Sequence, residues 1–421
     1  MSPGWPAEAN EDLPVPRSVA TEVPFPCGVS HAGLYLHIPF CSHLCPFCPY
    51  NRCSYEAMAF TRFEQAAHQE IDLYQPHLAG TAIGSLYVGG GTPTVDPAGL
   101  GRLLDHLRRV FEIGGPTCVE LHPANMDDKC LAILRAAGVS QVSIGVESLS
   151  DELLGRIGRS HDAATARDGV DRAVEAGFDS VNVDLMFALP GQSLEDWESD
   201  LAEILKRPVD QVSTYPLFGF PYSDLGRSER FGGIRRPAGR QVRRMLAATD
   251  RRAREAGFER CAVWSWIRPG RKKFSSVTRH HYVGFGPSAA SMIGSHFYVN
   301  TFDVDAYAAC LPARRPIALA MPADRRLEMA YWLYWRAYEL EINDDAFISV
   351  FGSGESLDGV FGMLLRPLAV AGMMRRHQKG WSITGSGAYW IHRVQNEYSL
   401  NYINRLWGKC RAQPWLAEIV L

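Results

Sequence analysis

Short apolar runs alternate with longer amphipathic stretches from about residue 33 to residue 218 of the chain. The apolar runs predict strands over Gly33–Ile38, Ser85–Val88, Cys118–Leu121, Gln141–Gly145, Ser180–Leu185 and Gln211–Leu217. Helical spacing in the stretches between them predicts helices over Tyr55–Tyr74, Leu100–Phe111, Asp127–Ala137, Ala163–Ala176 and Leu194–Leu205. A strand regularly followed by a helix is typical of parallel β/α units, so the sequence predicts an α/β fold.

The rest of the chain predicts two further regions. A helix is expected over Gln241–Ala256, followed by a Gly-rich segment that ends near Ser291. The C-terminal part is rich in Trp, Tyr and Met, and its apolar residues fall on one helical face at Ile391, Val394, Tyr398, Tyr402 and Leu406. We therefore expect a flexible N-terminal arm over 1–30, the main domain over 31–291, and a helical accessory domain over 292–421.

Composition favours a soluble protein that acts on small molecules. The formal net charge is −3, and the 43 basic residues are scattered with no long run, so no nucleic-acid footprint is evident. The ten cysteines suit a reducing cytoplasm better than a disulfide framework. The N-terminus lacks the basic start and apolar core of a signal peptide, and no apolar run is long enough for a membrane span. We expect a cytoplasmic protein with neither nucleic acid nor membrane as a partner.

Three cysteines stand at C-x3-C-x2-C spacing directly after the first predicted strand: Cys41, Cys45 and Cys48. Three thiolates on one loop can bind three irons of a [4Fe–4S] cube. The fourth iron then has no nearby protein ligand and keeps an open coordination position for a small molecule. The spacing therefore indicates a reactive iron–sulfur cluster.

Two other interpretations of the triplet stay open on spacing alone. Structural zinc normally has four ligands supplied by paired C-x2–4-C clusters. His43 or Cys53 would then be the fourth ligand, although the chain has no second C-x2-C pair. Coincidence is the remaining interpretation.

The segment Leu34-Tyr-Leu-His-Ile-Pro-Phe-Cys41 resembles the radical S-adenosylmethionine (SAM) superfamily, in the subgroup typified by oxygen-independent coproporphyrinogen III oxidase. Further motifs occur in that family's order: Gly89-Gly-Gly-Thr-Pro-Thr94, Glu120-Leu-His-Pro123, Ser143-Ile-Gly-Val-Glu147, Arg159-Ser-His161, Asn182-Val-Asp184 and Leu189-Pro-Gly191. The resemblance covers residues 33–220 with high specificity. It implies a partial (β/α)6 barrel with a mainly helical C-terminal domain, and a cluster held by the three cysteines with SAM at the open iron.

The resemblance also implies which residues bind SAM. The glycine loop with Gly90, Gly91 and Thr92 would bind the amino group of the methionine moiety, since glycine allows close backbone approach. Tyr35 and Phe47 would line the cluster and the adenine. Four charged residues match family positions around SAM: Glu120, Glu147, Arg159 and Asp184. Acidic groups suit the ammonium, sulfonium and ribose, whereas Arg159 suits the methionine carboxylate.

In this family the cluster donates one electron to SAM, and the resulting 5′-deoxyadenosyl radical removes a hydrogen atom from the substrate. We therefore expect no side-chain base or nucleophile as the main catalyst. We do expect an electron donor such as flavodoxin or ferredoxin as a partner, alongside a small-molecule substrate.

The substrate depends on departures from the oxidase pattern. The oxidase has a further cysteine two residues after the third cluster cysteine, where this chain has Tyr50, and Cys53 lies three positions later. The segment from Phe274 to Ser291 keeps a Gly-x-Gly element, and Ser275, Ser276 and Arg279 precede it as in methylase-like members. On this basis we expect methyl or methylene transfer to carbon of an aromatic or conjugated small molecule, with a second SAM as the carbon donor.

Two alternatives belong to the same subgroup. One is oxygen-independent coproporphyrinogen III dehydrogenase, which performs an oxidative decarboxylation. The other is a haem-binding chaperone, for which His37, His43, His280 or His281 would be the candidate axial ligands. All three activities share one fold, so the fold cannot choose between them.

Overall fold

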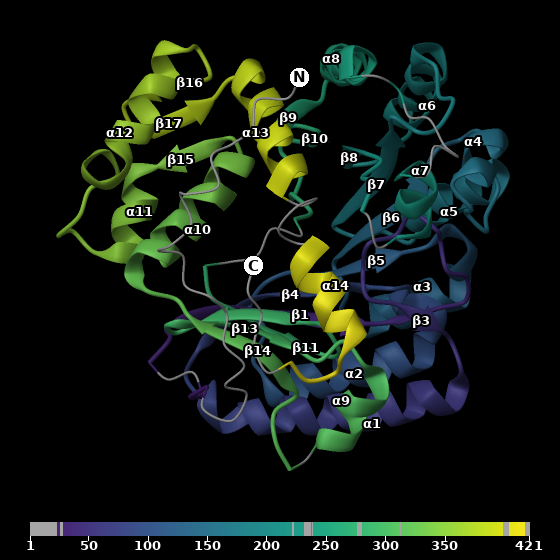
Figure 1. Cartoon of the computed structure of the whole chain (residues 1–421). Helices are drawn as coiled ribbons and strands as arrows, with labels where there is room; N and C mark the ends of the chain where they lie inside the picture. The colour runs from purple at the N-terminus through teal and green to yellow at the C-terminus, as the bar shows by residue number, and fades with distance from the viewer. Residues whose placement is uncertain are drawn as a thin grey trace.

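The computed structural model describes residues 23–25, 28–220, 223–230, 237, 239–275, 280–311, 313–398 and 404–416. One large sheet lies at the centre with helices around its outer face, and a smaller group of helices and strands lies to one side (Figure 1). Most of the predicted arm, residues 1–22 and 26–27, lies outside the described residues.

The large sheet has twelve strands, in the order β14-β13-β12-β11-β1-β4-β5-β6-β7-β8-β10-β9. All six predicted strands are present and parallel, as β1 (His31–Ile38), β4 (Ala82–Gly90), β5 (Thr117–Leu121), β6 (Gln141–Glu147), β7 (Ser180–Phe187) and β8 (Gln211–Pro216). The expected α/β fold is therefore confirmed, with the sheet open rather than closed into a barrel.

Short strands extend this sheet at both ends. Beyond β1 lie β11 (Tyr282–Phe285), which is parallel to β1, and the antiparallel strands β12 (Ala290–Ile293), β13 (His296–Asn300) and β14 (Ile317–Pro322). Beyond β8 lie β10 (Ser265–Ile267) and β9 (Glu259–Ala262), both antiparallel. A small separate pair, β2 (Phe40–Cys41) and β3 (Cys53–Ser54), brackets the cysteine loop.

Helices follow the strands, and several begin at a capping side chain. Six match the expected ranges: α1 (Ala57–Tyr74), α2 (Pro97–Val110), α3 (Asp128–Ala136), α5 (Ala163–Glu175), α6 (Leu194–Lys206) and α8 (Gly239–Glu255). Three short helices were not expected: α4 (Asp151–Arg156), α7 (Asp224–Arg230) and α9 (Val304–Cys310). Asp96, Asp127 and Asp162 accept a backbone N–H at the starts of α2, α3 and α5, and Ser193 forms a capping box with Asp196 at α6. The polar residue before each apolar periodic stretch thus fixes where the helix begins.

The main core lies between the sheet and these helices. Strand residues such as Leu36, Val88 and Val142 are fully buried, as are Leu104 of α2 and Ile204 of α6. Burial on both faces is the reason why the strands are continuous apolar runs rather than alternating ones.

The C-terminal part has a core of its own, built around Trp332, Phe347 and Trp381. Its elements are α10 (Arg325–Tyr338), β15 (Glu341–Asn343), α11 (Asp344–Phe351), α12 (Leu357–Val370), β16 (Met374–His377), β17 (Gly380–Ile383) and α13 (Gly385–Tyr398). The last helix, α14 (Asn404–Ala412), packs instead with the large sheet, because its Leu406 and Cys410 share a hydrophobic cluster with Val299 and Leu319. The separate core begins at α10, because β13 and β14 still pair within the large sheet.

The single C-terminal apolar face expected from helical spacing is not observed. Its positions fall on two helices, α13 and α14, and residues 399–403 between them lie outside the described residues. Val394 is 62% exposed, so it belongs to the solvent side of α13. Regular spacing alone did not reveal which side of the helix faces the protein.

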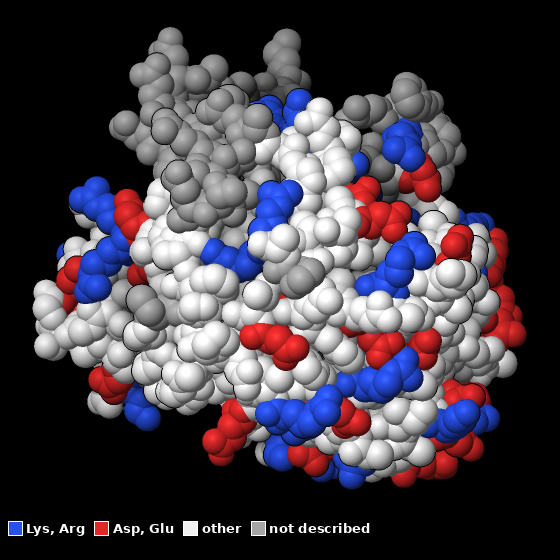
Figure 2. All heavy atoms as spheres, turned by 90° about the horizontal axis from the view of Figure 1, so that it is seen from below, with Lys and Arg blue, Asp and Glu red and all other residues white. Residues whose placement is uncertain are grey.

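The surface shows no field of a single charge sign on the face seen from below, where Lys and Arg alternate with Asp and Glu (Figure 2). None of the helices in the described part of the chain combines the length and the apolar character that crossing a bilayer demands.

A buried carboxyl group joins the strand extension to α1. Glu70 is fully buried and accepts hydrogen bonds from Gly286 N at 2.8 Å, Asn300 Nδ2 at 2.8 Å and Tyr307 Oη at 2.6 Å. Burial raises its pKa to about 7, while these three donors oppose the rise. The turn after β11, the end of β13 and α9 therefore all depend on one side chain of α1.

Replacing Glu70 with Ala leaves three buried donors unpaired. We expect the free energy of unfolding of the apoprotein to fall by about 2–4 kcal/mol, measured by guanidinium denaturation followed by circular dichroism. The exposed Glu112, replaced in the same way, provides the control and should change it by less than about 0.5 kcal/mol. Equal effects of the two substitutions would contradict a structural role for Glu70.

Candidate active site

The cysteine loop leaves the carboxyl end of β1 and returns to it. Pairing of Phe40 with Cys53 and of Cys41 with Ser54 closes the loop, and Cys48 N donates to Cys45 O inside it. All three predicted thiols line one pocket, whereas Cys53 is not among its lining residues. The loop thus presents three thiols to a common space at the end of the parallel strands.

His37 holds the loop in place. Its Nε2 lies 2.9 Å from Asn51 O, and its Nδ1 lies 2.8 Å from Tyr35 Oη. Because a carbonyl oxygen only accepts, Nε2 carries the proton and Nδ1 accepts from the tyrosine hydroxyl. Burial lowers the pKa of His37 to about 4, which keeps the ring neutral. Tyr35 is thereby turned toward His37, and it is not one of the residues that line the pocket.

The glycine loop after β4 packs directly on the cysteine loop. A Cβ on Gly91 would lie 2.6 Å from Phe40 O and 2.8 Å from Cys41 Sγ. Gly90 has a φ of +120°, a conformation that side chains disfavour, and a Cβ there would lie 2.8 Å from Ile38 O. These positions need glycine because two backbone segments meet there, and the result is a strip of backbone on the pocket wall beside the thiols.

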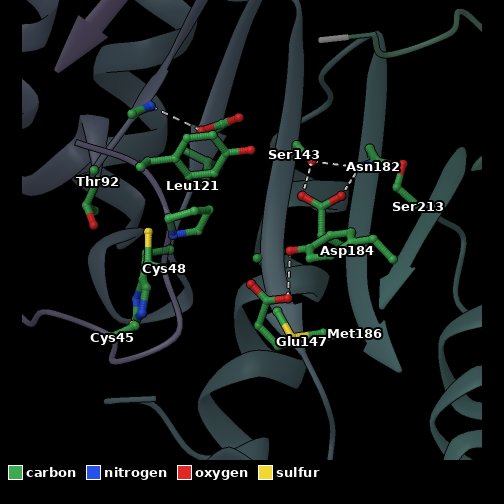
Figure 3. A pocket seen from close by; sticks show the side chains of 18 of the residues that line it. Cys45, Cys48, Thr92, Leu121, Ser143, Glu147, Asn182, Asp184, Met186 and Ser213 are labelled. Carbon is green, nitrogen blue, oxygen red and sulfur yellow. Dashed lines mark hydrogen bonds between the residues drawn. The ribbon is translucent and has the colours of Figure 1, made fainter. Parts of the chain in front are cut away.

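The three predicted acidic residues line the same pocket from three successive strands, β5, β6 and β7. Figure 3 shows two of them, Glu147 and Asp184. Glu120 accepts from Tyr87 Oη at 2.5 Å and from Gly90 N at 3.3 Å. Glu147 accepts from Tyr215 Oη at 2.8 Å. Each carboxyl group is thus oriented by a tyrosine from another strand.

Asp184 belongs to a hydrogen-bonded group of polar side chains across β6, β7 and β8. It accepts from Ser143 Oγ at 2.6 Å and from Asn182 Nδ2 at 2.9 Å, and Ser213 Oγ donates to Asn182 Oδ1 at 3.0 Å. Figure 3 shows this group across the pocket from the cysteines. The arrangement fixes the carboxyl group of Asp184 while leaving it on the pocket wall.

Burial raises the pKa of all three carboxyl groups. For Asp184 burial raises it to about 7, and the charges of Glu147 and Glu120 add to the rise. The pKa of Glu120 is raised by burial against its hydrogen bonds, and that of Glu147 is raised by burial against the attraction of Arg159. Three buried carboxyl groups around one space favour a cationic ligand.

Arg159 supplies the opposite charge between Glu147 and the thiols. Its Nη1 lies 4.0 Å from Glu147 Oε1 and 3.7 Å from Cys45 Sγ, and Nη2 donates to Gly145 O. Its Nε is buried without a hydrogen-bond partner among the described residues. A ligand with an anionic group next to a cationic one would complete this arrangement.

The pocket has a volume of about 310 Å³ and continues past the acidic residues. Its far side is formed by Trp264 and Ser265 near β10, by Lys273 and Phe274, and by Tyr338 of α10. Lys273 donates to Glu339 at 3.0 Å and to Cys261 O at 3.1 Å, so its charge is balanced. The accessory part of the chain therefore completes the pocket wall.

Comparison with known proteins agrees with this geometry. Residues 35–204 match the model of the Radical SAM superfamily. The heme chaperone HemW of Mycobacterium tuberculosis is 30% identical over 296 residues, which cover 68% of this chain and 76% of the relative. The chain belongs to the radical SAM superfamily, in its HemN-like subgroup.

Other relatives carry the similarity further along the chain. HemW of Bacillus subtilis is 27% identical over 84% of this chain and 95% of its own length. Oxygen-independent coproporphyrinogen III oxidase of Pseudomonas aeruginosa is 26% identical over 86% of this chain and 84% of its own length. The solved structure of HemN from Escherichia coli has a TM-score of 0.75 with 24% identity, covering 89% of this chain and 91% of that one, which supports the fold.

The residues of this radical SAM site fit a [4Fe–4S] cluster and SAM. Among the described residues, no three His, Cys, Asp or Glu side chains converge on a point as they would around a single metal ion. Three thiols on one loop at the pocket wall suit a cube, because each thiolate can bind a different iron. SAM carries ammonium, sulfonium and carboxylate groups. The carboxyl groups of the pocket and its strip of backbone suit the two cationic groups, and Arg159 suits the carboxylate.

Of the residues predicted for this site, all except Tyr35 line the pocket: Cys41, Cys45, Phe47, Cys48, Gly90, Gly91, Thr92, Glu120, Glu147, Arg159 and Asp184. Their individual roles toward cluster and SAM stay predictions. Sequence reasoning named Ser143 and Asn182 only as parts of motifs, and it missed Tyr87, Tyr215 and Tyr338. Their signal was weak, because a tyrosine inside an apolar run is typical of core. Ser276 and Arg279, expected near a second SAM, lie outside the described residues.

Removing one cysteine of the triplet should prevent cluster assembly. We expect Cys41→Ala to lose the iron–sulfur absorbance near 400 nm and all formation of 5′-deoxyadenosine after anaerobic reconstitution, because one iron then lacks its thiolate. The matched control is Cys130→Ala, since Cys130 is a buried cysteine of α3 that does not line the pocket. A Cys41 variant with normal iron content would remove the cluster assignment.

Asp184 should make SAM binding dependent on pH. Its carboxyl group is charged above a pKa of about 7, so the affinity for cationic SAM should rise as the pH increases from 6 to 8. We expect the change to be on the order of tenfold and Asp184→Asn to abolish it, as measured by equilibrium dialysis with reconstituted protein. Asp105→Asn on the exposed face of α2 should keep the wild-type profile. An unchanged profile in the Asp184 variant would assign the dependence to another group.

Proposed function

We propose that this radical SAM enzyme is a haem-binding protein of the chaperone type, which holds haem outside the pocket and SAM with its cluster inside. The observation that carries the proposal is the similarity to HemW, which spans 95% of the Bacillus subtilis relative. The relatives reported above are heme chaperones and coproporphyrinogen oxidases, so they favour a tetrapyrrole ligand over the methyl transfer expected from the sequence.

The charges of the pocket favour the chaperone over the oxidase. Coproporphyrinogen III carries four carboxylates, each of which needs a cation or several hydrogen-bond donors. Three described basic side chains line the pocket: Lys273 donates to Glu339, and Arg52 and Arg159 donate to Cys45 O and Gly145 O but each keep an Nε without a partner among the described residues. Three cations are fewer than the four carboxylates of this substrate. With three carboxyl groups on the same wall, a tetra-anionic substrate would meet mostly repulsion.

The size of the pocket argues against two SAM molecules within it. A volume of about 310 Å³ lies at the lower end of the range of roughly 300–1,000 Å³ for small-molecule sites. That space suits one SAM-sized ligand next to the cluster loop. The methylene-transfer reaction, which needs a second SAM and a substrate in contact, has less support than haem binding.

The candidate axial ligands differ in what their ring nitrogens already do. Both nitrogens of His37 are hydrogen-bonded. His281 bonds a backbone group of Met292, and its Nδ1 is buried. His43 uses Nε2 toward Gly158 O, and its Nδ1 keeps no partner among the described residues. His280 has a buried Nδ1, and no described residue bonds its Nε2. His43 lines the pocket itself, whereas His280 precedes β11 at the opposite end of the parallel strands, so the two cannot bind one haem together. We therefore favour His280 as the haem ligand outside the pocket.

Within the pocket, the chain supplies position and charge. The three cysteines would hold the cluster, and Gly90 and Gly91 would offer backbone groups to the amino end of SAM. When bound, cluster and SAM supply an electron and a reactive deoxyadenosyl radical. Tyr87 and Tyr215 orient Glu120 and Glu147 for the cationic parts of the ligand. Tyr338 and Trp264 cover the far side and keep water out.

A combined binding and turnover experiment tests the proposal. Anaerobically reconstituted protein is titrated with haem by visible absorption, and it is then incubated with SAM, dithionite and coproporphyrinogen III. We expect a stoichiometric haem complex and no decarboxylated porphyrinogen. His280→Ala should weaken haem binding at least about tenfold through loss of the axial ligand. His31→Ala, at an exposed histidine of β1, should leave it unchanged.

Two outcomes would overturn the proposal. Decarboxylation of coproporphyrinogen III with formation of 5′-deoxyadenosine would make the protein an oxidase. Formation of S-adenosylhomocysteine that depends on an added aromatic substrate would support methyl transfer instead.

A further inference from the structure

His122 is a pocket-lining residue without a role so far. It follows β5 in the segment Glu120-Leu-His-Pro and caps the short turn Pro123–Asn125. Its Nδ1 accepts a hydrogen bond from Ala124 N at 3.2 Å. Because Nδ1 is held by the backbone, the orientation of the ring relative to the pocket is fixed.

The cap also fixes which nitrogen carries the proton. A backbone N–H only donates, so Nδ1 of His122 must be unprotonated, and the neutral ring carries its hydrogen on Nε2. Burial, together with the charge of Arg159, lowers the pKa of His122 to about 2, which is consistent with a neutral ring. The pocket thus receives a fixed N–H donor and not a switchable cation.

The surroundings of His122 offer this donor no acceptor. The Nε2 atom of His122 has no hydrogen-bond partner among the described residues. It is not among the buried unpaired atoms either, in contrast to Nδ1 of the neighbouring His161. His161 lies edge-on at 5.1 Å between ring centroids, and its own Nε2 is bonded to Val146 O. His43 donates likewise to Gly158 O.

Two kinds of donor therefore meet on this side of the pocket. One is the guanidinium of Arg159, which lines the same pocket and lies beside His161, the ring that packs on His122, and the other is the N–H of His122. The carboxyl groups of Glu120, Glu147 and Asp184 already serve the cationic ends of a SAM-like ligand. The single anionic group of SAM is the carboxylate of its methionine part, and that group matches a pair of donors.

We propose that His122 binds SAM directly, donating Nε2–H to the methionine carboxylate next to Arg159. The proposal rests on SAM occupying this pocket. It makes His122 a binding residue that acts through one hydrogen bond to a charged group, for which the expected contribution corresponds to about tenfold or more in affinity.

The variants must separate the proposed hydrogen bond to SAM from the hydrogen bond with which His122 caps the turn at Ala124 N. His122→Ser keeps an oxygen that caps the turn but cannot reach the pocket, whereas His122→Asn keeps the cap and retains an N–H donor. Both variants should therefore have the wild-type melting temperature and the wild-type iron content. Only the serine variant should lose the bond to the ligand.

The measurement compares two ligands on reconstituted protein without reductant, so that no turnover occurs. We expect His122→Ser to weaken SAM binding at least about tenfold but to leave the binding of decarboxylated SAM within about twofold, since that ligand lacks the carboxylate. His122→Asn should recover most of the SAM affinity.

Three results would overturn the inference. If His122→Ser weakened the binding of both ligands equally, His122 would contact another part of SAM. If it weakened the binding of neither, His122 would make no contact with SAM. A changed electron paramagnetic resonance spectrum of the reduced cluster without SAM would make a cluster sulfide the acceptor. If wild-type protein with a full cluster bound neither ligand, SAM binding in this pocket would itself be refuted. That result differs from one in which wild-type protein binds both ligands and only the variant loses affinity.

Discussion

The structure depends on the close approach of three backbone segments at the carboxyl end of β1. Gly91 lies against Phe40, and a Cβ on Gly286 would lie 2.3 Å from His37 O. His37 in turn holds Asn51 at the far end of the cysteine loop. Because side chains are absent where these segments meet, backbone packing and not side-chain flexibility positions the three thiols. Gly286 N also donates to the carboxyl group of Glu70. Glu70 therefore helps to hold Gly286 against His37 and, through His37, the cysteine loop.

Charge is the second constraint, and it follows from the first. A strand end that brings thiols close to backbone N–H groups also gathers the side chains of the neighbouring strands, here Glu120, Glu147 and Asp184. Glu147 has a φ of +68°, which is uncommon for a residue with a side chain. Buried carboxyl groups with raised pKa values reduce stability unless a cation joins them. We infer that ligand binding and stability are coupled here, as is typical of a site organised for its ligand.

The sequence predicted what is local and missed what depends on distant segments. The six parallel strands and their helices follow from apolar runs and capping residues, because local pattern and burial agree there. The spacing of the cysteines could be recognised within one short segment, and the acidic residues could be found because each lies in a motif that resembles the family. By contrast, the tyrosines that orient Glu120 and Glu147 come from other strands. They could not be predicted, because no single segment of the sequence reveals which strands are neighbours in the sheet. The exposed side of Val394 and the pairing of β13 and β14 with the main sheet likewise depend on contacts between distant elements.

Tyr50 shows how a single departure from the family pattern can require a distant part of the chain. It stands where the oxidase has a cysteine, and its ring lies 6.2 Å from that of Trp407 on α14. Arg411 of the same helix donates to Pro49 O at 3.1 Å and to Tyr50 O at 2.5 Å. A small thiol at this position would leave Trp407 without that aromatic contact, so the larger side chain and the C-terminal helix form one unit. The helix thereby fixes the segment directly after Cys48.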